Sequence, residues 1–123
     1  MGKTYETSEN AKADFLKTHY YKTTSEQLLK YIPTLLETKY SFKILTVNDD
    51  YNEICAYNNK FDLTVKVIMS EINQTAVDFF ITSRYLFDIN KTKNLINEIY
   101  DSLSKEYPFI GLALNKGSEK ENK

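Results

Sequence analysis

The sequence predicts a two-layer α+β domain, in which helices precede and follow a four-stranded antiparallel meander and the C-terminal helix packs on one face of the sheet. Three observations support this fold class. Apolar residues recur with helical spacing near both ends of the chain, they alternate with polar residues between Ser41 and Phe87, and Asn and Asp separate the alternating runs. At 123 residues with 41% hydrophobic composition, the chain can form one core. We expect a single domain over residues 8–114, after a flexible segment 1–7 and before a disordered polar tail 115–123.

Two helices are expected at the N-terminal end of this domain. The first covers about Ser8–Thr18, with apolar residues on one side. The second begins after Thr24, because Thr24 and Gln27 have the spacing of a capping box and a leucine-rich helical pattern follows. Pro33 lies inside that pattern and lacks a backbone donor, so we expect it to kink the second helix or divide it in two.

The middle of the chain has the two-residue period of β-strands. The expected strands are Ser41–Asn48, Asn52–Asn58, Phe61–Glu71 and Thr75–Tyr85. The chain has 3 glycines, and none of them lies between Lys3 and Ile110. We therefore expect Asn and Asp to form the tight turns of the meander, because they tolerate the left-handed backbone conformation better than other non-glycine residues.

The apolar faces of the last hairpin predict how its strands pair. Matching them places Val67 opposite Phe79 and Val65 opposite Ile81. The same register sets Asp62 opposite Arg84 on the outer face, with Lys66 diagonal to Asp78. We expect a cross-strand ion pair between Asp62 and Arg84.

A final helix is expected over about Lys91–Lys105, where apolar residues again recur with helical spacing. The segment Phe109–Leu114 after it is too apolar for a free tail. We expect this segment to pack on the core or to add an edge strand to the sheet.

Composition excludes several function classes. The formal net charge is −1 and Arg84 is the only arginine among 16 basic residues, so neither nucleic acid nor a membrane surface is an expected partner. The chain has no apolar run long enough for a spanning helix and no signal peptide, which predicts a cytoplasmic protein. Its abundance of Lys, Asn, Ile and Tyr is typical of an AT-rich bacterial or phage genome.

No residue pattern indicates catalysis, a metal or a cofactor. The single histidine, His19, is expected at the end of the first helix, and the single cysteine, Cys55, is expected inside a strand as a small apolar residue. One His and one Cys cannot form a typical zinc site. Asp49 and Asp50 are the densest acidic pair, and turn formation explains them.

The second face of the sheet is the predicted interaction surface. The strand alternation leaves an unusual number of apolar residues on this outer face: Leu45, Val47, Cys55, Tyr57, Ile68 and Phe80. A patch of this kind usually marks a contact surface. It could pair with a second copy, bind another protein, or be covered by the N-terminal helix or the Phe109–Leu114 segment.

The sequence favours a small non-enzymatic binding or regulatory protein that acts through this outer face, as a homodimer or with a protein partner. The alternative is a small-molecule carrier or a small enzyme. Its pocket would lie between helices and sheet and would be lined by Tyr31 and Tyr100.

Overall fold

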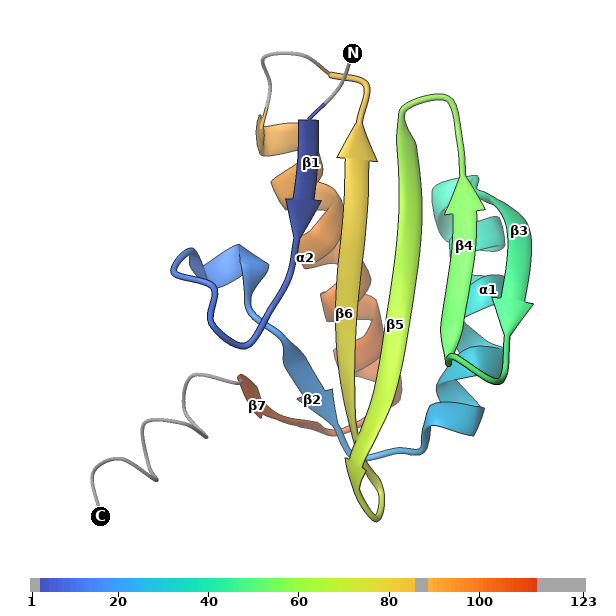
Figure 1. The fold of residues 1–123 in the computed structure, drawn as a ribbon, viewed down its shortest axis with the longest axis vertical. Helices are drawn as coiled ribbons and strands as arrows, with labels where there is room; N and C mark the ends of the chain where they lie inside the picture. Colours follow the sequence, from blue (N-terminus) through green and yellow to red (C-terminus); the bar gives the residue numbers. More distant parts are fainter. Residues whose placement is uncertain (1–2, 86–88, 113–123) are drawn as a thin grey trace.

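A seven-stranded antiparallel sheet forms one layer of the computed structural model, which describes residues 3–85 and 89–112, and two α-helices lie behind it (Figure 1). The strands are β1 (Lys3–Glu6), β2 (His19–Tyr21), β3 (Lys43–Asn48), β4 (Glu53–Tyr57), β5 (Phe61–Glu71), β6 (Gln74–Ser83) and β7 (Phe109–Leu112). The helices are α1 (Ser25–Tyr40) and α2 (Ile89–Glu106), and a single 3₁₀ turn covers Asp14–Leu16. The predicted α+β class is therefore confirmed, with one α-helix rather than two at the N-terminal end.

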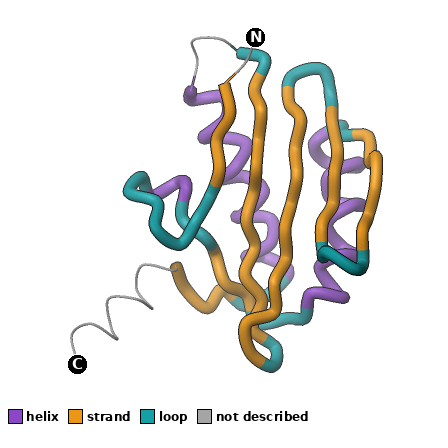
Figure 2. Tube along the Cα trace, viewed as in Figure 1, coloured by secondary structure: helices purple, strands orange, loops and turns teal. Residues whose placement is uncertain are grey.

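The strand order is β3-β4-β5-β6-β2-β7, and β1 also pairs with β6. The four-stranded meander predicted from the sequence forms one side of this sheet. The other side is built from the two ends of the described chain, since β2 lies between β6 and β7 (Figure 2). The segment Phe109–Leu112 adds the expected edge strand, and residues 3–6, placed before the domain by the sequence, form β1. The predicted tail 115–123 lies outside the described residues.

The first predicted helix, Ser8–Thr18, is wrong. Strands β1 and β2 both pair with β6, β1 with its C-terminal half and β2 with its N-terminal half. The residues between them leave the sheet as a loop that contains only the 3₁₀ turn, and Ser8 bonds back to Leu16 and Thr18 near the closing point of the loop. Pairing with β6 satisfies backbone groups that a helix would have satisfied internally, so tertiary context overrides the local pattern.

Helix α1 begins as the capping box predicts. The Thr24 hydroxyl accepts a hydrogen bond from the Gln27 backbone N–H at 3.2 Å. The helix continues through Pro33 to Tyr40 and is not divided in two. It ends at Ser41, whose φ of 60° lies in the left-handed region that glycine usually occupies.

Asn side chains and left-handed Asn residues make the turns, as the lack of glycine predicts. Asn52 and Asn73 have φ values of 55° and 57°. The Asn58 side-chain oxygen accepts hydrogen bonds from the backbone N–H groups of Lys60 and Phe61 in the β4–β5 turn. These contacts replace the usual glycine turns at little conformational cost.

The β5–β6 register differs from the predicted one by two residues. Val65 pairs with Phe79 and Val67 with Val77. A two-residue turn follows Glu71, and a bulge between Met69 and Glu71 shifts the pairing once more. Because the registers differ by two residues over Phe61–Met69, the side chains of that stretch keep their predicted faces.

The core lies between the helices and the inner face of the sheet. Each helix buries one apolar stripe against that face, as do the alternate residues of β4, β5 and β6. The fully buried positions include Leu28, Ile32 and Leu36 of α1, Ile96, Ile99 and Leu103 of α2, and Ile54, Val65, Val67, Val77 and Ile81 of the strands. This one-sided packing leaves the opposite face of β3–β6 without a helix layer (Figure 1).

Candidate functional sites

Four large apolar side chains stand on the outer face of the meander. Leu45 is 63% exposed, Ile68 is 49%, Phe80 is 47% and Tyr57 is 37%. Cys55, the fifth predicted member, is half-buried, and its thiol lies 3.7 Å from the Thr64 hydroxyl. The strand register places polar residues between these apolar ones, for instance Thr64 between Cys55 and Phe80. The face is therefore mixed rather than continuously apolar.

Val47 does not belong to this outer face. A β-bulge between Ile44 and Thr46 inserts one residue into β3, and beyond it Val47 pairs with the buried Ile54. Cα partners in antiparallel strands share a face, so Val47 lies on the helix side. There it lines a shallow hollow together with Leu29 of α1. A bulge of this kind leaves no mark in the alternation of β3.

A row of charges crosses the centre of the outer face. Glu53, Lys66 and Asp78 stand opposite one another on β4, β5 and β6, and the Lys66 ammonium lies 3.2 Å from a Glu53 carboxylate oxygen. Lys66 is thus directly opposite Asp78, not diagonal to it as the sequence predicted. Charges of alternating sign on adjacent strands leave little net field on this face.

The Asp78 side chain joins the two ends of the loop between β1 and β2. Its carboxylate accepts hydrogen bonds from the Thr7 hydroxyl at 2.7 Å and from the Thr18 hydroxyl at 2.5 Å. Burial raises the pKa of Asp78, the two hydroxyls oppose that effect, and the carboxylates of Glu9 and Glu6 add to it. The sequence does not reveal this cluster, because Thr7 and Thr18 lie where a flexible segment and a helix were expected.

The same loop covers one corner of the outer face. Tyr20 and Ala76 are cross-strand neighbours there, and both are buried. The Tyr20 hydroxyl donates a hydrogen bond to the Glu9 carboxylate from the loop, and burial raises the pKa of Tyr20. The sequence named the N-terminal helix or the Phe109–Leu114 segment as possible covers of the predicted patch, but this loop covers a different corner. Within the described residues, Leu45, Tyr57, Ile68 and Phe80 stay exposed.

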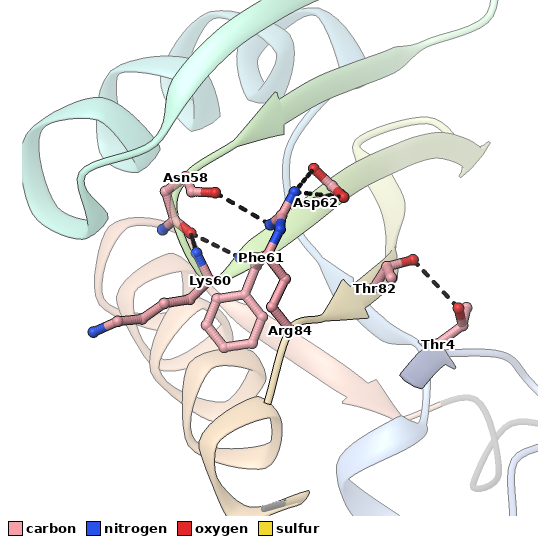
Figure 3. A network of polar contacts seen from close by, with 7 residues as sticks. All are labelled: Thr4, Asn58, Lys60, Phe61, Asp62, Thr82 and Arg84. Atoms are coloured by element: carbon pink, nitrogen blue, oxygen red, sulfur yellow. Dashed lines mark hydrogen bonds and ion pairs between the residues drawn. The ribbon is translucent and has the colours of Figure 1, made fainter. Parts of the chain in front are cut away.

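The lone arginine makes the predicted ion pair in a diagonal geometry. One Arg84 nitrogen lies 3.0 Å from each oxygen of the Asp62 carboxylate, although Asp62 is opposite Thr82 in the register (Figure 3). A second Arg84 nitrogen donates to the backbone oxygen of Asn58 at 3.2 Å. Arg84 therefore ties the end of β6 to the β4–β5 turn. Both charged side chains are about half exposed, so the pair adds well under about 1 kcal/mol.

A groove opens at the end of the molecule where the β4–β5 turn meets the two helices. It has a volume of about 730 Å³ and lies between the C-terminal end of α1, the N-terminal half of α2 and that turn. Its lining residues are mainly Tyr, Lys and Asn: Tyr40, Tyr57 and Tyr85, Lys43, Lys60 and Lys91, and Asn58, Asn59 and Asn94. Four lining residues of α2 lie three or four positions apart and so share one face of the helix: Lys91, Asn94, Leu95 and Glu98. This spacing was the only part of the groove that the sequence pattern could have indicated.

The two tyrosines predicted to line a pocket lie elsewhere. Tyr100 is buried in the core, where its hydroxyl donates to the Val77 carbonyl at 2.8 Å. Tyr31 is partly buried at the edge of the core and packs edge-on against Tyr107 at 5.6 Å. Neither residue lines the groove. Both tyrosines lie in the predicted helices, but helical spacing alone does not show whether a tyrosine faces the core or lines a pocket.

His19 lies in β2 and not at a helix end. Its ring stacks on Tyr100 with centroids 3.5 Å apart, and Phe109 is tilted against it at 5.1 Å. Burial lowers the pKa of His19 to about 4, so the ring is neutral near neutral pH. The aromatic contacts explain the residue as part of the packing between β2, β7 and α2.

Within residues 3–85 and 89–112 there is no cluster of three or more Cys, His, Asp or Glu side chains able to hold a metal ion. No helix in the same ranges is both long enough and apolar enough to cross a membrane. Comparison with protein-family models, with curated proteins and with solved structures finds no match.

Proposed function

We propose that this chain is a non-enzymatic binding protein that docks a protein on the outer face of its sheet, and that a second copy of the chain is the first partner. One observation carries the proposal: four large apolar side chains are exposed on a sheet face that neither of the described helices covers. Exposed groupings of this kind usually mark contact surfaces.

The composition of the face favours a reversible contact over a permanent one. Tyr57 and Phe80 are aromatic, a residue class enriched at interfaces, and the charged row through Lys66 lies beside them. Obligate interfaces are more uniformly apolar. The formal net charge of −1 means that two copies repel each other only weakly.

Light scattering coupled to size-exclusion chromatography tests this proposal. We expect the wild-type mass to rise above the 14.4 kDa of the monomer as loading concentration increases. Phe80→Lys should stay monomeric at every concentration, because it places a charge in the centre of the contact. Ile72→Lys is the matched control, since Ile72 is 89% exposed on the β5–β6 turn and lies off the face.

Circular dichroism of both variants verifies that they fold. A wild-type mass that stays at 14.4 kDa throughout would contradict self-association. If pull-downs with the wild type and with Phe80→Lys then recover the same proteins, the outer face has no docking role. Equal loss of association in Ile72→Lys would also count against the proposal.

A further inference from the structure

The groove between the β4–β5 turn and the helices is distinct from the docking surface proposed above. Its volume of about 730 Å³ falls within the range of about 300–1,000 Å³ typical of small-molecule sites. Tyr57 and its cross-strand partner Lys43 reach the groove from the outer face of the sheet, and the other lining residues come from the two helices, the β4–β5 turn, the start of β5 and the chain after β6. The groove therefore needs its own functional explanation.

Positive charge dominates the groove lining. Lys43, Lys60 and Lys91 contribute three ammonium groups from β3, the β4–β5 turn and α2, and within residues 3–85 and 89–112 Glu98 is the only lining residue with a carboxylate. None of the three lysines has a carboxylate of a described residue within ion-pair distance. An excess of about two positive charges in a concave site attracts an anion of small size.

Aromatic surface accompanies this charge. The Tyr85 ring has the ammonium groups of Lys91 at 5.6 Å and of Lys60 at 6.0 Å from its centroid, and it packs on Phe61 at 5.8 Å. Leu95 adds apolar area from α2. Flat apolar surface beside cationic groups suits a ligand with an aromatic body and an acidic substituent.

Hydrogen bonds fix the backbone of the β4–β5 turn that contains Lys60. Asn58 accepts from the N–H groups of Lys60 and Phe61 at 2.8 and 2.9 Å, its side-chain nitrogen donates to the Tyr40 carbonyl at 3.3 Å, and Arg84 bonds its backbone oxygen. Figure 3 shows the Lys60 side chain extending away from the Arg84–Asp62 pair. Because these hydrogen bonds already order the turn, it loses less conformational entropy when a ligand binds.

We infer that this groove binds a small aromatic carboxylate or phosphate, with its acidic group among Lys43, Lys60 and Lys91 and its ring against Tyr85. This assignment is independent of the outer-face proposal.

Amide proton–nitrogen correlation spectra of the wild type, titrated with naphthoate, test the inference. We expect shifts concentrated at Lys43, Asn58–Phe61, Tyr85 and Lys91–Leu95. Naphthamide has the same ring without the charge and should bind about 5-fold or more weakly. Phenyl phosphate and inorganic phosphate are titrated in the same way. If the two bind with equal affinity, the ring contributes nothing to binding and the proposed contact with Tyr85 is wrong.

Two double variants separate groove charge from total charge. Lys60→Gln with Lys91→Gln should weaken naphthoate binding by about 5-fold or more, since each lost ammonium costs a fraction of a kcal/mol. Lys12→Gln with Lys105→Gln removes the same charge from exposed sites outside the groove and should bind like the wild type. Shifts scattered over the surface, equal binding of naphthamide, or equal weakening in both double variants would each overturn the inference.

Discussion

At the scale of single residues, two partly buried titratable groups respond to pH in opposite directions. His19 is stacked in an aromatic cluster that favours its neutral form. Asp78 is a partly buried carboxyl whose charged form is disfavoured by burial and by two neighbouring carboxylates. Each group therefore links folding to protonation over its own pH range.

For His19 we expect the free energy of unfolding to fall as pH is lowered from 6.5 towards about 4. In that window the unfolded histidine binds a proton and the folded one does not, so stability present above 6.5 is lost on acidification. The expected loss is about 2 kcal/mol, because the ring keeps some contact with water. Urea unfolding across this range measures it. His19→Phe keeps a ring in the stack and should remove the step; an unchanged step in that variant would contradict the assignment.

For Asp78 the sign is reversed. Its pKa is raised above the ordinary 3.8, so its contribution to stability is present below that value and is lost as pH rises through the folded pKa. The wild type should therefore gain stability relative to Asp78→Asn when pH is lowered from about 7 to about 3. Paired urea titrations at the two pH values measure the difference. A difference that is constant with pH would show that Asp78 does not titrate in a shifted range.

At the scale of elements, left-handed backbone positions show how a chain almost without glycine ends its helices and turns. Asn52 and Asn73 tolerate this conformation because a short polar side chain bonds locally. Ser41, at the end of α1, has no such advantage. The cap of α1 is therefore the position where a glycine should improve the fold.

Ser41→Gly should raise the free energy of unfolding by about 0.5–1 kcal/mol, since glycine adopts positive φ without strain. Chemical denaturation of the purified variant measures the change. Asn73→Gly should gain less, because Asn already tolerates the conformation. Glu37→Gly lies on the exposed side of α1 and should lose about 1 kcal/mol. A loss of stability in Ser41→Gly would contradict the strain assigned to Ser41.

Pattern length decides which elements could be predicted from the sequence. Helices α1 and α2 and strands β3–β6 each have several periods of their apolar pattern. The predicted start of α1 and the predicted bounds of α2 and β3–β6 lie within about two residues of the observed ones. Strands β1 and β2 are too short to show a period and owe their conformation to β6. The bulges at Leu45 of β3 and Ser70 of β5, like the irregular register between β2 and β7, depend on strand pairing and have no local signal.

The same distinction explains the candidate sites. Leu45, Cys55, Ile68 and Phe80 were placed on the outer face by alternation alone, whereas Val47 was misplaced because a bulge precedes it. The groove was missed because it collects residues from both helices, three strands and the turn between β4 and β5, and no single window of sequence contains its charge excess. Sites of that kind follow from tertiary packing and not from local pattern.

At the scale of the whole molecule, the helices shield one face of the sheet and leave the other exposed. The core, the stacked rings around His19 and the buried hydroxyl of Tyr100 all lie on the shielded side. The exposed side has the mixed face that we propose as a docking surface. The groove lies where the β4–β5 turn meets the helix ends, so the ligand and the partner that we propose would occupy neighbouring parts of the surface.

The position of β2 has a consequence for synthesis on the ribosome. The meander β3–β6 consists of hairpins that can close as they emerge, but β2 is made long before either of its neighbours, β6 and β7. Until Phe109–Leu112 leaves the exit tunnel, one edge of β2 keeps open backbone groups that can recruit a foreign strand. Strand β7, the last strand among the described residues, thus pairs with an edge that β2 leaves open from early in translation, and a chain stopped after α2 would be the form most prone to aggregate.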